Sequence, residues 1–129
     1  MGYVADMRFA EADKNSGYLI EAYGREGIQI DGRRYGQGLA LSPQRIIAPW
    51  GPPSPAEFAT EHLETLLTLA PQVMVLGTGT HQVFPDPAVY CDVLSRGIGV
   101  EIMDTGAACR TYNILVSEGR RVVAGLLPC

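Results

Sequence analysis

The chain has 129 residues, 47% of them hydrophobic, and its 10 basic and 14 acidic residues give a formal net charge of −4. This size fits one domain with a single core, and the acidic balance excludes the basic surface that nucleic-acid binding normally requires. No apolar run approaches the roughly 18 residues that span a bilayer, and residues 1–17 lack the apolar centre of a signal peptide. We expect one soluble, cytoplasmic domain over residues 1–129 without membrane insertion, with residues 1–17 as a poorly ordered N-terminal segment.

The first half of the chain has the pattern of short β-strands. Four partly alternating apolar runs are separated by turn-forming residues, at 18–23, 27–30, 35–41 and 45–49. Asp31-Gly32 is the clearest hairpin signal among these turns. We predict an antiparallel meander that ends at residues 50–53, where two prolines lack the N–H donors that a strand ladder needs.

The second half alternates helices with strands. Ser54-Pro55 and Asp86-Pro87 pair a capping residue with proline at the first helical position, and glycine follows two of the three helical patterns. The predicted order is a helix from Ser54, a strand at 72–76, a helix from Asp86 to Gly97, a strand at 100–103, a helix at 105–118 and a strand at 122–127. This order indicates an α/β domain whose parallel strands are joined by right-handed crossovers.

Two turns are predicted to lie at the carboxyl ends of neighbouring parallel strands, where open α/β sheets commonly bind ligands. The first, Gly77-Thr78-Gly79-Thr80, can present backbone N–H groups and hydroxyls to an anion, or it is simply a tight glycine turn. The second, Asp104-Thr105-Gly106, leads directly into a helix, so it offers either an anion site or a helix cap.

Three charged or polar residues near the last helix are candidates for recognition or for structure. Arg110 and Asn113 are three residues apart on a helix, so they can contact one partner together, or they belong to an ordinary solvated face. Glu101 lies among apolar residues, and burial of an unpaired carboxylate is costly. We expect it to form a structural ion pair with Arg110 or Arg120 rather than to act as a general base.

The remaining reactive residue types suggest no chemistry. His62 and His81 have no second imidazole or carboxylate cluster at ligand spacing, so we expect no metal site and no cofactor. The three cysteines include no C-x-x-C pair, which favours a reducing compartment over a disulfide framework. Cys109 lies in the first turn of a helix without a companion base in its motif, so we expect a small packed residue rather than a nucleophile.

Several segments together resemble one small family. They are Val75-Leu76-Gly77-Thr78-Gly79, Val100-Glu101-Ile102-Met103-Asp104-Thr105, Cys109-Arg110-Thr111-Tyr112-Asn113 and Glu118-Gly119-Arg120. The set is similar to the domain of unknown function shared with mitochondrial complex I assembly factor 3, and the likeness extends over residues 18–128. It implies a three-layer α/β fold around a mixed sheet. Because the chain lacks an Arg- and Ser-rich presequence, we expect a free-standing member of the prokaryotic type.

The resemblance also implies roles for the matching residues. Gly77, Gly79 and Thr105 suit turns and caps, Glu101 and Arg120 suit an ion pair, and Arg110 with Asn113 suits recognition.

The leading hypothesis is a non-enzymatic binding or assembly protein that docks onto a respiratory complex or its assembly factors through Arg110, Asn113 and the two turns. The alternative is a site for a small anionic ligand, or an enzyme that uses Cys109 or Glu101, in the crevice between residues 77–80 and 104–106.

Overall fold

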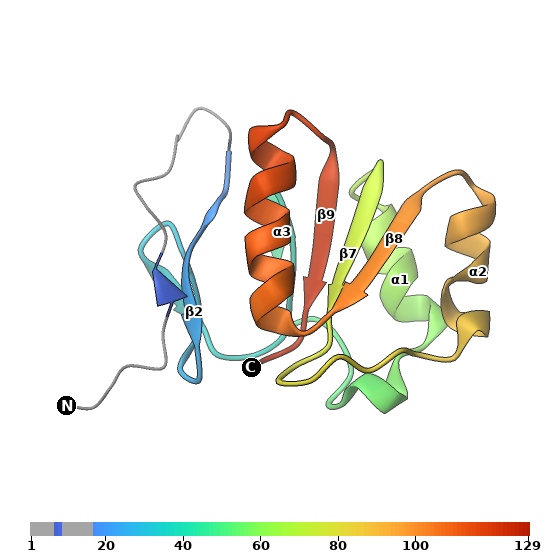
Figure 1. Ribbon diagram of the computed structural model, residues 1–129, viewed down its shortest axis with the longest axis horizontal. Coiled ribbons are helices and arrows are strands. Elements are labelled where there is room, and N and C mark those ends of the chain that lie inside the picture. Colours follow the sequence, from blue (N-terminus) through green and yellow to red (C-terminus); the bar gives the residue numbers. More distant parts are fainter. Residues whose placement is uncertain (1–6, 9–16) are drawn as a thin grey trace.

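The computed structural model describes Met7–Arg8 and residues 17–129, and a five-stranded mixed sheet lies at its centre (Figure 1). In spatial order this central sheet contains β6 (Arg45–Ile47), β5 (Leu39–Ser42), β9 (Val122–Leu126), β7 (Val73–Gly77) and β8 (Gly99–Met103). β7 runs parallel to β8 and β9, whereas β5 runs antiparallel to β6 and β9. The predicted mixed, partly parallel sheet is therefore confirmed.

A smaller antiparallel sheet precedes the central one. Its strands follow one another in chain order, as β1 (Met7–Arg8), β2 (Ile20–Gly24), β3 (Gly27–Ile30) and β4 (Arg33–Tyr35). The hairpin predicted at Asp31-Gly32 joins β3 to β4, and both turn residues have positive φ, 52° and 79°, as a tight hairpin turn requires. The expected poor order of residues 1–17 concerns a stretch of which only Met7, Arg8 and Gly17 are described.

The prediction of one strand over residues 35–41 is wrong, because the chain passes there from one sheet to the other. β4 ends at Tyr35 and β5 begins at Leu39 in the central sheet. Gly38 permits the passage: it accepts a hydrogen bond from the Trp50 N–H at 2.8 Å, and a Cβ at this position would lie 2.1 Å from the Trp50 carbonyl oxygen. The predicted single meander is thus a small sheet followed by the β5–β6 hairpin.

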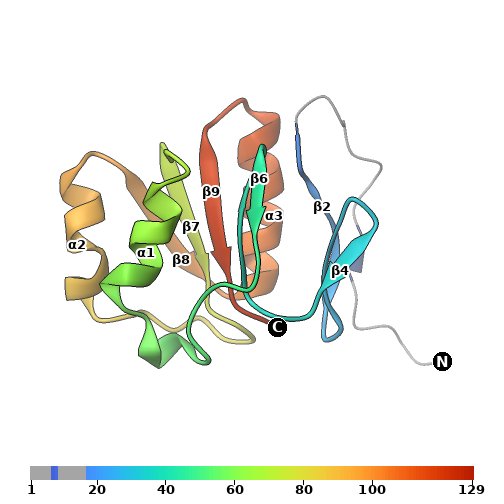
Figure 2. The same ribbon diagram turned by 180° about the vertical axis from the view of Figure 1, so that it is seen from behind.

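The connections between the parallel strands place helices on both faces of the central sheet. The chain steps from β7 to β8 through α2 (Pro87–Ser95) and then back past β7 to β9 through α3 (Thr105–Ser117). Because crossovers share one hand, reversing the direction of travel moves the helix to the opposite face. α1 and α2 cover one face, and α3 together with the small sheet covers the other (Figures 1 and 2). This is the expected three-layer arrangement.

The first long helix begins later than its start signal predicts. Pro55–Glu57 form a single 3-10 turn, Phe58 is extended, and α1 (Thr60–Leu67) follows. The Ser54 hydroxyl donates to the Glu57 carboxylate at 2.9 Å instead of capping a backbone N–H. The break buries Phe58 against Trp50, with ring centroids 5.9 Å apart, so tertiary packing overrides the local signal.

The other helix boundaries agree with the sequence. Asp86 caps α2 by accepting a hydrogen bond from the Ala88 N–H at 2.9 Å, and Asp104 caps α3 by accepting one from the Ala107 N–H at 2.9 Å. Gly97 and Gly119, just beyond the two helices, have positive φ angles of 80° and 79°. Glycine tolerates this left-handed conformation, which ends a helix without strain.

Candidate functional site

The two predicted turns meet at the carboxyl edge of the central sheet. β7 and β8 are direct neighbours, which brings Gly79 and Thr105 together. The Gly79 N–H donates to Thr105 Oγ1 at 2.8 Å, and the Thr105 N–H donates to the Gly79 carbonyl oxygen at 2.8 Å. The predicted closeness of the turns is therefore confirmed, and they are bonded directly to each other.

The threonine hydroxyls of these turns are engaged inside the protein. Thr78 Oγ1 donates to the His81 carbonyl oxygen at 2.5 Å and accepts from the Val83 N–H at 3.1 Å. Thr105 Oγ1 donates to the Leu127 carbonyl oxygen at 2.7 Å. The Thr78 and Thr105 side chains are 2% and 0% exposed. This geometry agrees with tight structural turns, and it leaves these hydroxyls without a free hydrogen for a ligand in the crevice.

Asp104 belongs to the same local structure, because its carboxylate occupies the Ala107 N–H at the start of α3. An N-cap side chain uses the backbone donors that an anion would otherwise bind. The capping interpretation of Asp104 is confirmed. A ligand-binding role for Gly77, Thr78, Gly79, Asp104 and Thr105 stays a prediction.

Asn113 is only partly exposed on α3, and its side-chain amide is bonded within the protein, so its role in recognition stays a prediction. Its side-chain oxygen accepts from the Ile20 N–H at 2.9 Å, and its side-chain nitrogen donates to the Ile20 carbonyl oxygen at 2.8 Å. The amide thus completes the hydrogen bonding of β2 and ties the small sheet to α3. Helical spacing could not reveal this contact, because 93 residues separate the two partners.

Arg110 is exposed on α3, as predicted, but it also contacts the small sheet. Its guanidinium donates a hydrogen bond to the Tyr23 hydroxyl and lies 5.9 Å from the centroid of the Tyr23 ring. One turn further along α3 is Ile114, a large apolar residue that is 57% exposed. We call the surface formed by Arg110, Asn113, Ile114, Ser117 and Glu118 the outer face of α3, and these residues line a shallow hollow of about 520 Å³.

Ile114 is the residue of this surface that the sequence analysis did not single out. The spacing of the residues could have indicated its position, since Ile114 follows Arg110 by four residues and so lies on the same side of the helix. Ile114 therefore places a large apolar side chain among the polar groups of this surface.

The ion pair predicted for Glu101 is wrong. Among the residues that the structure describes, no ion pair joins Glu101 to Arg120 or to Arg110. Glu101 is exposed on β8, the last strand at one edge of the central sheet, and Arg120 is exposed beyond α3. The prediction assumed that the apolar neighbours of Glu101 bury its carboxylate, but an edge strand lets the carboxylate remain in water, so no partner is required.

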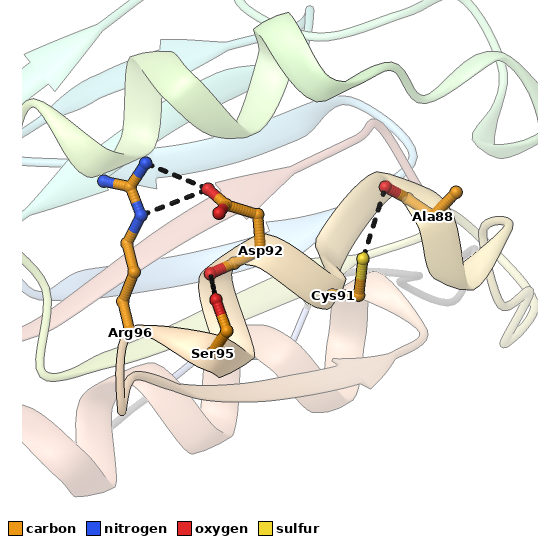
Figure 3. Close-up of polar contacts among 5 residues, drawn as sticks. All are labelled: Ala88, Cys91, Asp92, Ser95 and Arg96. Atoms are coloured by element: carbon orange, nitrogen blue, oxygen red, sulfur yellow. Dashed lines mark hydrogen bonds and ion pairs between the residues drawn. The ribbon is translucent and has the colours of Figure 1, made fainter.

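The cysteines differ in their surroundings. Cys109 is fully buried, and this burial is the main reason that its pKa lies far above the ordinary thiol value; Cys129 raises the pKa further. A thiol held in its neutral form is a poor nucleophile, so the predicted packing role of Cys109 is favoured. Cys91 is exposed on α2, with its sulfur 3.9 Å from the Ala88 carbonyl oxygen (Figure 3).

The described residues form neither a metal site nor a membrane-spanning helix. No group of three or more His, Cys, Asp or Glu side chains there is arranged to hold a metal ion. His62 instead accepts a hydrogen bond from the Ala59 N–H at 2.9 Å, which caps α1. In the same part of the chain, no helix combines the length and the apolar character that a membrane crossing demands.

Several known proteins resemble this chain in sequence or in structure. The chain is 34% identical over 120 residues to NADH dehydrogenase [ubiquinone] 1 alpha subcomplex assembly factor 3 of Danio rerio, covering 92% of this chain and 68% of that protein. It is 33% identical over 111 residues to an uncharacterized protein of Rhodobacter capsulatus, covering 84% and 83% of the two chains. The chain thus spans about two thirds of the length of the vertebrate protein.

The crystal structure of a protein from Bordetella parapertussis superimposes with a TM-score of 0.82 at 41% identity, covering 87% of this chain and 96% of that one. Residues 20–127 match the family described as protein of unknown function DUF498/DUF598. This match includes both turns, all of α3 and β2, the strand that Asn113 and Arg110 contact. The chain therefore belongs to the DUF498/DUF598 family.

Proposed function

We propose that this chain is a non-enzymatic binding protein that assists the assembly of a respiratory complex, and that it docks onto its protein partner through the outer face of α3. Its similarity to assembly factor 3 of the NADH dehydrogenase supports the class of function. The observation that carries the docking surface is Ile114, which is 57% exposed beside the guanidinium of Arg110.

The chemistry of this surface suits a protein partner. An exposed apolar side chain ringed by charged and polar groups is the usual composition of an interface centre with its rim. Arg110 and Glu118 provide opposite charges on either side of Ile114 along the helix. Arg110 is also held in place by Tyr23, so less side-chain entropy is lost when a partner binds it.

The alternative, a small anionic ligand in the crevice between residues 77–80 and 104–106, is less well supported. The two turns donate to each other, and both threonine side chains are buried. A ligand would have to replace these internal hydrogen bonds. An enzyme that uses Cys109 or Glu101 in this crevice has still less support, because Cys109 is buried and Glu101 lies exposed on the edge strand β8.

Affinity purification of the tagged protein from its own host, followed by mass spectrometry, tests the proposal. We expect subunits of a respiratory complex to be recovered with the wild type. Ile114→Glu places a charge at the centre of the apolar contact, and we expect it to reduce their recovery by about tenfold or more, as the loss of an interface centre does. Arg110→Glu should have a similar effect.

Leu94→Glu is the matched control. Leu94 is 48% exposed on α2, on the opposite face of the central sheet, so the same change in charge there should leave recovery unchanged. Circular dichroism would verify that all variants are folded. Full recovery of every partner by Ile114→Glu would exclude the outer face of α3, and the absence of any respiratory subunit with the wild type would argue against the assembly role itself.

A further inference from the structure

A basic hollow of the described surface lies between the edges of the two sheets. β4 is the last strand of the small sheet and β6 is the last strand of the central sheet. Residues from both strands line one cavity of about 600 Å³. The Tyr18 N–H donates to the Pro43 carbonyl oxygen at 2.8 Å, which holds the two sheets together beside this cavity. We call it the intersheet pocket.

Arginines approach the intersheet pocket from both sheets. Arg33 and Arg34 come from β4, and Arg45 comes from β6. The lining also includes the side-chain amides of Gln37 and Gln44, and among the described residues that line the pocket none is acidic. In a chain with a net charge of −4, this concentration of positive charge is local.

The orientation of Arg33 follows from the strand register. Arg33 pairs with Ile30, and Tyr35 pairs with Ile28. Directly paired residues of antiparallel strands project from the same face, so Arg33 and Tyr35 share the face that carries two buried isoleucines. The Arg33 guanidinium carbon lies 5.2 Å from the centroid of the Tyr35 ring. Tyr35 therefore supports the guanidinium while its N–H donors remain available.

Arg33 and Arg45 differ in their partners from Arg96, at the end of α2, and from Arg110 of α3. Arg96 is paired with Asp92 at 2.9 Å (Figure 3), and Arg110 is bonded to Tyr23. For Arg33 and Arg45, no ion pair exists within the described part of the chain. Both are exposed at the rim of a concave site, so an incoming anion meets two cations that no carboxylate of the described residues pairs with.

We propose that the intersheet pocket binds a small molecule that carries at least two oxyanion groups, either phosphates or carboxylates, between Arg33 and Arg45. The planar guanidinium group has a donor geometry that matches both kinds of oxyanion. The volume lies within the range of small-molecule sites, about 300–1,000 Å³. Two cations that reach the cavity from different sheets favour a ligand with separated negative charges over a single small anion.

This site is distinct from the outer face of α3, so the proposal does not depend on the assembly role. It is also distinct from the crevice at the carboxyl edge of the central sheet, where the internal hydrogen bonds of Thr78 and Thr105 oppose ligand binding. In the intersheet pocket, Arg34 is bonded to the Gln29 side chain at 3.0 Å, whereas Arg33 and Arg45 reach the cavity from different sheets and have no ion pair among the described residues.

Nuclear magnetic resonance titration of the full chain tests the proposal, with pyrophosphate and citrate as the two probes at constant ionic strength. We expect saturable shifts of the backbone amides of residues 33–37 and 44–46 at millimolar probe. The Arg33→Gln/Arg45→Gln double variant should weaken binding by about tenfold or more, because charge-assisted hydrogen bonds are lost. Binding of pyrophosphate alone would identify a phosphate ligand, and binding of citrate alone a polycarboxylate.

Arg25→Gln is the control, since Arg25 is exposed between β2 and β3 and does not line the pocket. It removes a positive charge from the same sheet and should leave both titrations unchanged. An equal loss of affinity in Arg25→Gln and in the double variant would overturn the proposal, because it would show only a response to net charge. The absence of saturable shifts with both probes would also overturn it, even if an acidic polypeptide bound there.

Discussion

Tyr112 and Cys109 are titratable residues that the fold holds in their neutral forms. Both side chains are fully buried, and burial is the main cause that raises the pKa of each above its ordinary value. Tyr112 retains one polar contact, since its hydroxyl donates to the Tyr18 carbonyl oxygen at 2.8 Å. The phenol therefore contributes a hydrogen bond as well as packing, whereas ionisation of either group would place a charge in the core.

This burial predicts a loss of stability in alkaline solution. In the unfolded chain the thiol and the phenol ionise near their ordinary pKa values of 9.0 and 10.0. Above these values the unfolded chain binds fewer protons than the folded one, so the free energy of unfolding falls as pH rises, by up to about 1.4 kcal/mol per pH unit for each group. At pH values below these ordinary pKa values, both groups are protonated in the folded and in the unfolded chain, so they cause no loss of stability.

Tyr112→Phe tests this prediction in urea unfolding measured as a function of pH. At neutral pH we expect the variant to be less stable than the wild type by about 1 kcal/mol, because a hydrogen bond is lost. The difference should shrink above the ordinary phenol pKa, because phenylalanine does not ionise. Parallel stability curves for the two proteins across the alkaline range would contradict the prediction.

At the scale of elements, β9 shows how a central strand accommodates a large neighbour. Gly125 lies in β9 beneath the ring of Trp50, and a Cβ there would approach Trp50 Cη2 to 2.4 Å and Leu66 Cδ1 to 2.9 Å. Trp50 is almost fully buried and donates its indole N–H to the His62 carbonyl oxygen at 3.1 Å. The ring is held on its far side, so it cannot retreat from an added methyl group.

Gly125→Ala is therefore expected to destabilise the protein, although alanine usually suits a strand better than glycine does. Overpacking a well-filled core costs about 1–3 kcal/mol, and we expect a decrease of that size in chemical unfolding. Gly36→Ala is the control, since no heavy atom lies within 4 Å of a Cβ at that position. A neutral or stabilising effect of Gly125→Ala would show that Trp50 can move.

Elements with strong local signals were predicted well. The proline-capped start of α2, the Asp104 cap of α3 and the Asp31-Gly32 hairpin all depend on contacts within three residues. The start of α1 was predicted wrongly for the opposite reason. Ser54 and Pro55 favour a helix locally, but Phe58 must leave the helical conformation to reach Trp50.

At the scale of the whole molecule, α3 joins the two sheets. It packs against β7 and β9 of the central sheet and against β2 of the small sheet. Polar contacts also join α3 to the small sheet: Asn113 bonds both the N–H and the carbonyl oxygen of Ile20, and Arg110 donates to the Tyr23 hydroxyl. These bonds fix where the small sheet lies against the helix.

Asn113→Ala leaves both backbone groups of Ile20 without this partner in a partly buried site. We expect the free energy of unfolding to fall by about 1–3 kcal/mol, and amide hydrogen exchange to accelerate in β2 and β3 before it does in β7 and β9. Ser95→Ala is the control, because that hydroxyl bonds only within α2, to the Asp92 carbonyl oxygen at 2.7 Å. Uniform acceleration throughout the chain would argue against a local role.

The candidate site was predictable only in part. The closeness of the two turns followed from the alternation of strands and helices, because consecutive parallel strands in such units are often neighbours. That the turns bond to each other depends on the Thr105 side chain reaching Gly79 and Leu127. Likewise, Arg110 and Asn113 were placed correctly on one helix, but the partner of Asn113 lies 93 residues earlier in the chain.

Local sequence was sufficient for the α/β class, the helix caps and most strand positions, since caps, hairpins and apolar periodicity act over one or two turns of chain. The division of the N-terminal strands between two sheets, the outer face of α3 and the intersheet pocket emerge only in the folded molecule. Arg33 and Arg45 are 12 residues apart in different sheets, and no pattern in the chain indicates that they face one cavity. Long-range packing decides such placements because it combines many weak contacts that no short segment contains.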